Sequence, residues 1–120
     1  MTGQKRAWLY GRVAHDDGIA SIESAVQMDL LRHWAAEHGY AIAGETTETG
    51  SGIRPDRPGL SEVMRAVREK QMDVLGVRKL DCLTRDPLDA CGLMQTLKEY
   101  GVYLICTGKN FIPNLLVTPF

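Results

Sequence analysis

The sequence is poor in cysteine. Its 120 residues include three cysteines, Cys82, Cys91 and Cys106, and no two of them form a C-x-x-C pair. An odd number without paired spacing argues against a disulfide framework and against a zinc site. We therefore predict a reducing, cytoplasmic compartment. We also expect no metal and no cofactor.

Long apolar runs and an excess of charge are also missing. No segment approaches the ~20 consecutive apolar residues of a membrane helix, and the first ten residues, MTGQKRAWLY, lack the apolar stretch of a signal peptide. The net charge is -1, because 14 Lys and Arg stand against 15 Asp and Glu. We expect no contact with a membrane. Any contact with nucleic acid must come from a local group of cations, since the chain has no overall positive field.

The sequence does contain a regular series of apolar runs. Four of them, at residues 6–14, 40–48, 72–80 and 102–107, predict strands. The first run, RAWLYGRVA, is continuous and mostly apolar, which is typical of a strand buried on both faces. Runs of this length bounded by polar loops favour a sheet as the centre of the fold.

Amphipathic stretches separate these runs and predict helices that begin near Ser21, Gly59 and Pro87. The last of them has Asp86 as its N-cap and ends at Gly101. The first stretch carries an apolar stripe at four-residue spacing, the pattern of a helix face turned to a core. Its members are Ile22, Val26, Leu30 and Trp34, with Leu31 and Ala35 alongside. Strands alternating with such helices predict a three-layer α/β fold, with a largely parallel central sheet flanked by helices.

Three polar loops are expected to meet at one edge of this sheet, because the carboxyl ends of parallel strands lie together and α/β proteins place their sites there. The loops span residues 11–17, 47–59 and 79–86. Their arginines are Arg12, Arg54, Arg57 and Arg85. Arginine binds phosphate oxygens with a planar fork, so the group indicates an anion pocket that suits a phosphodiester. The alternative is that these are surface arginines paired with the aspartates of the same loops.

Taken together, the motifs resemble the catalytic domain of serine recombinases, the resolvase and invertase group. The likeness runs from about residue 9 to residue 106 and rests on YGRVA, on SG followed by DRPGL, and on DVLGVRKLDCLTRD. Members with large C-terminal extensions, such as transposon and phage integrases, are the nearest match. Members of the family cut DNA with a serine hydroxyl that attacks a phosphodiester and becomes linked to the 5′ end, while arginines stabilise the transition state without metal ions.

The resemblance assigns functional positions one by one. It implies that the catalytic positions are Arg12, Gln27, Asp81 and Arg85, and that the phosphate- and DNA-binding positions are Ser51 and Arg57. Two departures stand out. Ala14 occupies the position of the nucleophilic serine, and Cys82 occupies the position of a catalytic arginine. Alanine has no group that attacks phosphorus and cysteine cannot clamp a phosphate oxygen, so the resemblance implies a degenerate site.

Another hydroxyl could in principle replace the missing nucleophile. The candidates are Ser21, Ser24, Ser51 and Thr84. None of them stands at the strand exit beside Arg12, so we expect no rescue and leave the enzymatic status of the chain open.

The resemblance also bears on domain organisation. We expect residues 1–107 to form a truncated resolvase-like catalytic domain and residues 108–120 an irregular tail, because Pro113 and Pro119 interrupt the long dimerising helix with which family members continue. The predicted class is site-specific DNA recombination, with DNA bound weakly and without sequence preference. The alternatives are a non-enzymatic modulator that binds a full-length recombinase, or a decayed gene product. A second copy of the chain is a further candidate partner.

Overall fold

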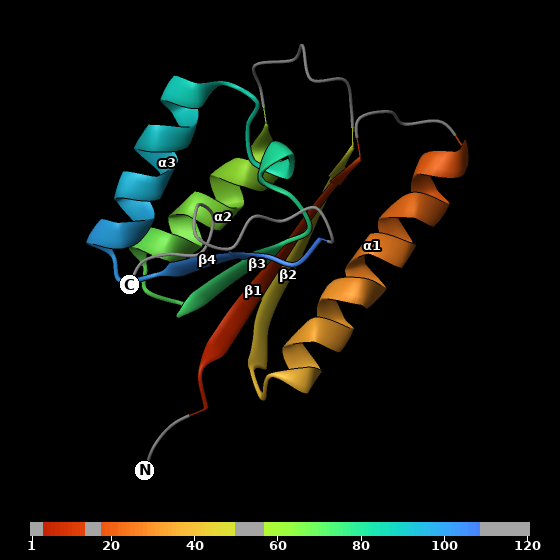
Figure 1. The fold of residues 1–120 in the computed structure, drawn as a ribbon, viewed down its shortest axis with the longest axis horizontal. Helices are drawn as coiled ribbons and strands as arrows, with labels where there is room; N and C mark the ends of the chain where they lie inside the picture. The colour runs from red at the N-terminus through yellow and green to blue at the C-terminus, as the bar shows by residue number, and fades with distance from the viewer. Residues whose placement is uncertain (1–3, 14–17, 50–56, 109–120) are drawn as a thin grey trace.

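The computed structural model describes residues 4–13, 18–49 and 57–108. Its sheet contains β1 (Arg6–Val13), β2 (Ala41–Thr49), β3 (Val74–Val77) and β4 (Tyr103–Cys106) in the order β2-β1-β3-β4. All three pairings between these strands are parallel. Figure 1 shows the strands side by side, with their carboxyl ends at one edge. The predicted parallel arrangement of the strands that contain Leu9, Val74 and Leu104 is therefore confirmed.

Helices cover both faces of the sheet. α1 (Gly18–Glu37) lies against one face, whereas α2 (Pro58–Arg68) and α3 (Pro87–Glu99) lie against the other (Figure 1). A short 3-10 helix, η1 (Leu80–Cys82), follows β3. The three-layer α/β fold predicted from the sequence is confirmed.

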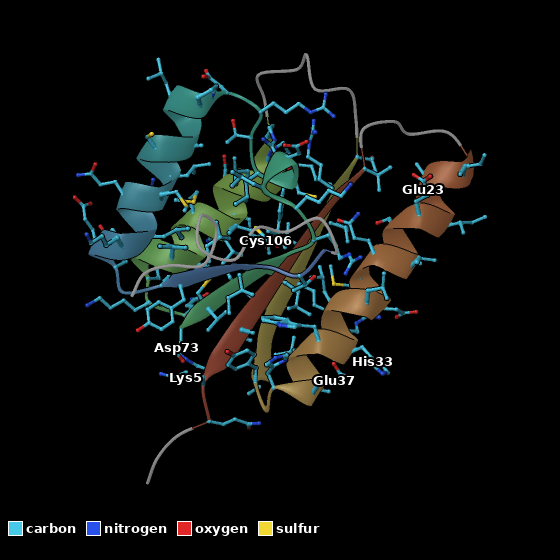
Figure 2. All side chains as sticks on the ribbon, viewed as in Figure 1. Lys5, Glu23, His33, Glu37, Asp73 and Cys106 are labelled. Carbon is cyan, nitrogen blue, oxygen red and sulfur yellow. The ribbon has the colours of Figure 1, made fainter. Side chains whose placement is uncertain are left out.

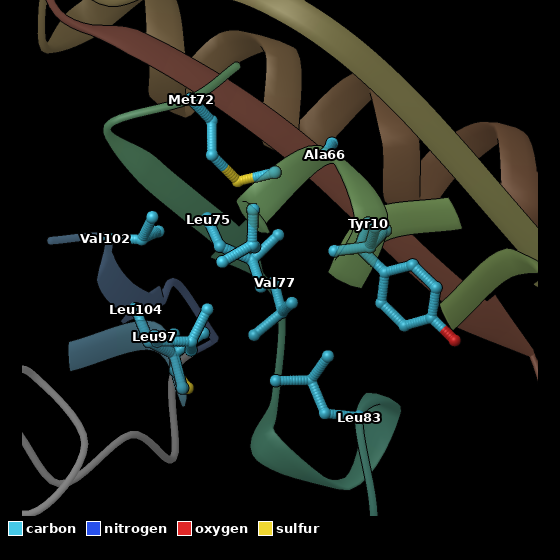
Figure 3. Packing of buried hydrophobic residues seen from close by; sticks show 12 residues of the cluster. Tyr10, Ala66, Met72, Leu75, Val77, Leu83, Leu97, Val102 and Leu104 are labelled. Carbon is cyan, nitrogen blue, oxygen red and sulfur yellow. The ribbon is translucent and has the colours of Figure 1, made fainter. Parts of the chain in front are cut away.

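The alternation of side chains along β1 explains why two separate cores form. Ala7 and Leu9 are fully buried and pack with Met28, Leu31 and other residues on the α1 side. Tyr10 points to the opposite face and joins the larger cluster formed by α2, β3, α3 and β4 (Figure 3). Because successive residues of a strand point to opposite faces, an unbroken apolar strand such as β1 supplies both cores.

The apolar residues predicted for the first helix divide between core and surface. Leu31 and Ala35 are fully buried and Trp34 packs against the same core, whereas the other three are exposed. Ile22 and Val26 are 65% and 53% exposed, and Leu30 is also exposed. The buried residues of α1 are Ala20, Met28, Leu31 and Ala35. This helix is apolar on two faces, so periodicity did not decide which one meets the sheet.

Two element boundaries also differ from the prediction. The third strand spans Val74–Val77 and not 72–80, because the chain leaves the sheet after Val77 and turns into η1. α1 begins at Gly18, three residues before the predicted start. The third helix begins at Pro87 as predicted, and the Asp86 carboxylate accepts a hydrogen bond from the Leu88 amide at 3.0 Å, as an N-cap does.

The start of α2 is capped from outside its own segment. Arg57 stands at the N-cap position and its side chain makes no capping hydrogen bond. Instead, Glu48 Oε2 at the end of β2 accepts a hydrogen bond from the Gly59 amide at 2.8 Å. A Cβ atom at Gly59 would lie 2.9 Å from the Glu48 carboxyl carbon, so the close approach favours glycine.

Within the described residues, no helix is long and apolar enough to cross a membrane. The predicted tail lies outside the described residues apart from Gly108, whose amide donates a hydrogen bond to Arg78 O at 2.8 Å. The division of the chain after residue 107 therefore stays a prediction.

Candidate functional site

A cavity of about 560 Å³ opens at the carboxyl edge of the sheet, between β1, α1 and the segment after β3. It brings together five of the predicted positions, which are Arg12, Gln27, Asp81, Cys82 and Arg85. Glu23, labelled on the first turns of α1 in Figure 2, also lines it. Positions that lie 73 residues apart in the sequence (12 to 85) therefore share one site. Ala14 and Ser51 lie outside the described residues.

Gln27 holds the backbone of Arg12 in place. Its Oε1 accepts a hydrogen bond from the Arg12 amide at 2.9 Å, and its Nε2 donates to Arg12 O at 3.5 Å. β3 pairs with β1 only as far as Leu9, so beyond this point the side chain of Gln27 replaces a neighbouring strand. A Cβ atom at Gly11 would lie 2.9 Å from Gln27 Oε1, and only glycine leaves room for this contact.

Cys82 occupies the position that the family motif gives to an arginine, and it packs against the larger core with its Sγ near two neutral oxygen atoms. Its Sγ lies 3.9 Å from Arg12 O and 3.8 Å from Gln27 Oε1. A thiol is a weak donor and carries no fork of N–H groups. The side chain thus fills space between the third motif and β1 and offers no cation to the cavity.

The cavity nevertheless has a positive balance of charge. Four cationic side chains line it, those of Arg12, Arg78, Lys79 and Arg85. Two carboxylates oppose them, those of Glu23 and Asp81. Sequence reasoning did not name Arg78 or Lys79 as site residues: Arg78 was assigned to the strand run 72–80, and Lys79 stands where this run overlaps the exit loop 79–86. The signal that could have found them is their position immediately after β3, at the edge where the other site residues lie.

Arg57 does not line this cavity. Its Nη2 donates to Tyr10 Oη at 2.6 Å and to Cys82 O at 2.7 Å, and its Nη1 donates to Leu83 O. Its Nε lies 3.6 Å from Glu48 Oε1. Burial, followed by the hydrogen bond to Glu48, raises the pKa of Tyr10 well above its usual range, so its hydroxyl stays protonated and donates to Glu48 Oε1 at 2.6 Å.

Among residues 4–13, 18–49 and 57–108, no group of three or more His, Cys, Asp or Glu side chains is placed to hold a metal ion. The arginines and the lysine that line the cavity can bind an anionic oxygen and stabilise charge on it.

These observations define a class: an α/β domain with a cationic pocket at the carboxyl edge of a parallel sheet. The family model described as "Resolvase, N terminal domain" matches residues 7–114, and the chain belongs to this family. The resemblance predicted from the motifs is confirmed.

Solved structures agree with this assignment. The C-terminal catalytic domain of ISC1926 TnpA, an IS607-like serine recombinase, is 23% identical with a TM-score of 0.78, and the match covers 86% of this chain and 70% of that one. The N-terminal catalytic domain of TP901-1 integrase is 26% identical with a TM-score of 0.73, over 86% and 78%. A resolvase family site-specific recombinase from Streptococcus pneumoniae is 23% identical with a TM-score of 0.75, over 87% and 72%.

Proposed function

We propose that this chain is a serine-recombinase-like domain that binds the phosphodiester backbone of DNA weakly and does not cut it. The observation that carries the proposal is Cys82, which stands in the position of a clamp arginine and directs its Sγ to the neutral oxygens Arg12 O and Gln27 Oε1. Ala14, in the position of the nucleophile, supports it from the sequence.

The cavity supports binding without cleavage. Cleavage in the family needs a serine oxygen to bond to phosphorus while the 3′ oxygen leaves, and the methyl group of Ala14 cannot form that bond. The charge that builds on the phosphate in the transition state would meet one arginine fewer. Arg12, Arg78, Lys79 and Arg85 can still attract a phosphate group, because ground-state binding needs only local positive charge.

The test restores the two missing groups. Ala14→Ser, Cys82→Arg and the double variant are each fused to the dimer helix and DNA-binding region of an intact family member and incubated with labelled supercoiled DNA. We expect no 5′-linked adduct on denaturing gels from the unmodified chain. Each single variant should form adduct at least about a hundredfold more slowly than the double variant.

Two results would contradict the proposal. An adduct formed by the unmodified chain in the fusion would mean that another residue is the nucleophile. An inert double variant, beside an active intact family member, would mean that the pocket has lost more than these two groups.

A second candidate function is that of a modulator that binds a full-length recombinase. It is favoured by the exposed apolar residues on α1, namely Ile19, Ile22, Val26 and Leu30. Exposed apolar clusters of this kind often form protein interfaces. Sedimentation of the chain alone and mixed with an intact family recombinase separates self-association from complex formation.

A cytoplasmic location, expected from the unpaired cysteines, also stays a prediction.

A further inference from the structure

A buried polar cluster lies behind the cavity, on the opposite side of β1 from α1. It consists of Tyr10, Glu48 and Arg57. Tyr10 is fully buried, and the side chains of Glu48 and Arg57 are 10% and 18% exposed. Tyr10 donates to Glu48 and accepts from Arg57, both at 2.6 Å, so the three groups form a chain of hydrogen bonds. Glu48 and Arg57 carry opposite charges, and the cluster is formally neutral.

Arg57 connects this cluster to the turn that carries the third motif. It donates to the carbonyl oxygens of Cys82 and Leu83, the last residue of η1 and the one after it. Carbonyls at the end of a short helix have no partner within it, so the guanidinium caps the turn. Lys79 O and Leu80 O already accept the Cys82 and Leu83 amides inside the turn.

The same turn faces the cavity on its other side. Cys82 Sγ points to Arg12 O and Gln27 Oε1, while Asp81 and Arg85 line the cavity directly. Arg57 therefore lies on one side of the turn and the cavity on the other. Its Nη1 and Nη2 groups donate to Tyr10, Cys82 and Leu83, and Arg57 is not among the described residues that line the cavity.

We propose that Arg57 is a positioning residue, which fixes the turn at residues 79–85 against β1, and that it does not bind phosphate itself. Tyr10 and Glu48 orient its guanidinium. The proposal deepens the proposed function, because the turn that Arg57 holds carries the groups of the phosphate pocket, but its geometric part is measurable without DNA.

Arg57→Lys separates charge from geometry. A lysine keeps the positive charge beside Glu48, but its single ammonium cannot reach acceptors in three directions as the planar fork does. If Arg57 acts through its charge on DNA, the lysine variant keeps most of the binding. If it acts by holding the turn, the lysine variant loosens the turn.

Cys82 is a natural reporter of the turn. In a Cys91→Ser background the remaining thiols are Cys82, which is half-buried, and Cys106, which is 2% exposed. Modification of Cys82 by a disulfide reagent such as DTNB at pH 8 measures opening of the turn, and modification of Cys106 measures opening of the core. We expect Arg57→Lys to raise the Cys82 rate by about tenfold or more, with the Cys106 rate unchanged.

Arg85→Lys is the matched control, since Arg85 lines the cavity and makes no hydrogen bond to Tyr10, Glu48 or Arg57. The Cys82 modification rate of this variant should equal that of the background. Tyr10→Phe removes one acceptor of Arg57 and leaves the guanidinium in place. We expect this variant to raise the rate of Cys82 modification by about threefold. This variant carries the test if Arg57→Lys does not fold. An unchanged Cys82 rate in the folded variants overturns the proposal.

DNA binding supplies the second measurement. Fluorescence anisotropy with a short labelled duplex at several salt concentrations gives the slope of log K against log salt. Loss of a phosphate ligand makes this negative slope shallower by about one. We expect this change for Arg85→Gln and not for Arg57→Gln. If Arg57→Gln has a shallower slope and an unchanged rate of Cys82 modification, Arg57 is a phosphate ligand and the proposal is overturned. If no variant binds DNA, the proposed function fails while the Cys82 rates still decide the role of Arg57.

Discussion

At the scale of single residues, the site depends on short polar side chains that replace missing backbone partners. Gln27 accepts from and donates to the backbone of Arg12 where β3 has already left β1. Glu48 takes the capping role that Arg57 leaves vacant at the start of α2. Each contact lies beside a glycine. A Cβ atom at Gly11 would collide with the side chain of Gln27, and one at Gly59 would collide with that of Glu48. The local sequence explains neither contact, since each partner comes from another element.

A pair of residues at the opposite edge of the sheet gives a prediction about pH. Asp73 Oδ2 accepts from the Arg6 amide at 2.8 Å and from Arg6 Nε at 3.3 Å, at the starts of β3 and β1 (Figure 2 labels Asp73). The side-chain hydrogen bond, followed by the backbone one, holds the pKa of Asp73 below its usual value. A lowered folded-state pKa stabilises the fold above about pH 4, and this stabilisation is lost as the pH falls through the folded-state pKa.

We therefore expect Asp73→Asn to lower the free energy of unfolding at pH 7 by about 1 kcal/mol or less, since the pair is partly exposed. The difference from the parent protein should shrink below pH 4 and vanish near pH 2. Urea unfolding at pH 7, 4 and 2 checks this. If the difference in the free energy of unfolding stays constant across these pH values, the substitution acts through altered packing or hydrogen-bond geometry and not through the loss of the charge on Asp73.

At the scale of elements, α1 shows how a helix with two apolar faces is placed. Leu30 and Leu31 are neighbours, yet Leu30 is 44% exposed whereas Leu31 is fully buried against β1 and β3. Trp34 lies over Gly76 of β3, where a Cβ atom would meet its ring at 2.6 Å. The register of the helix on the sheet is set by such close contacts and not by the number of apolar residues on a face.

The two leucines give a matched pair of variants. We expect Leu31→Ala to lower the free energy of unfolding by about 2–5 kcal/mol and Leu30→Ala by about 0.5 kcal/mol or less. Leucine and alanine have similar helix propensities, so the difference measures burial. Chemical denaturation at low protein concentration is the measurement. Equal losses, especially ones that grow with protein concentration, would mean that the exposed face of α1 is covered in an assembly.

At the scale of the whole molecule, the net charge of -1 and the cationic cavity have opposite effects on the attraction of DNA. The molecule has no overall positive field, and the described pocket sets four cations against two carboxylates. Binding energy from so few phosphate contacts is small and strongly dependent on salt.

We expect dissociation constants of about 10⁻⁴ M or weaker at physiological salt, the same for two unrelated duplexes, with a slope of log K against log salt no steeper than about -4. Fluorescence anisotropy on both duplexes checks this. Tight binding to one duplex at physiological salt would require a base-reading element and would contradict the prediction.

Much of this protein could be predicted from its sequence, for physical reasons that are local. Alternating apolar runs and helical stretches determined the α/β class, and the order of YGRVA, DRPGL and KLDCLTRD indicated the family, because each motif is a short contiguous segment. Parallel strands bring their carboxyl ends together, so the meeting of Arg12, Asp81 and Arg85 in one cavity also followed from the predicted sheet.

Tertiary structure alone decided which face of α1 is buried, where β3 ends, and where the guanidinium of Arg57 points. Arg57 was grouped with the phosphate-binding arginines, since an exit loop and a positive charge are all that the sequence shows. Its guanidinium instead faces Tyr10 and the carbonyl of Cys82, residues 47 and 25 positions away. A buried arginine satisfies its N–H groups with whatever acceptors the packed strands bring near it, and those acceptors are fixed only when the elements have assembled.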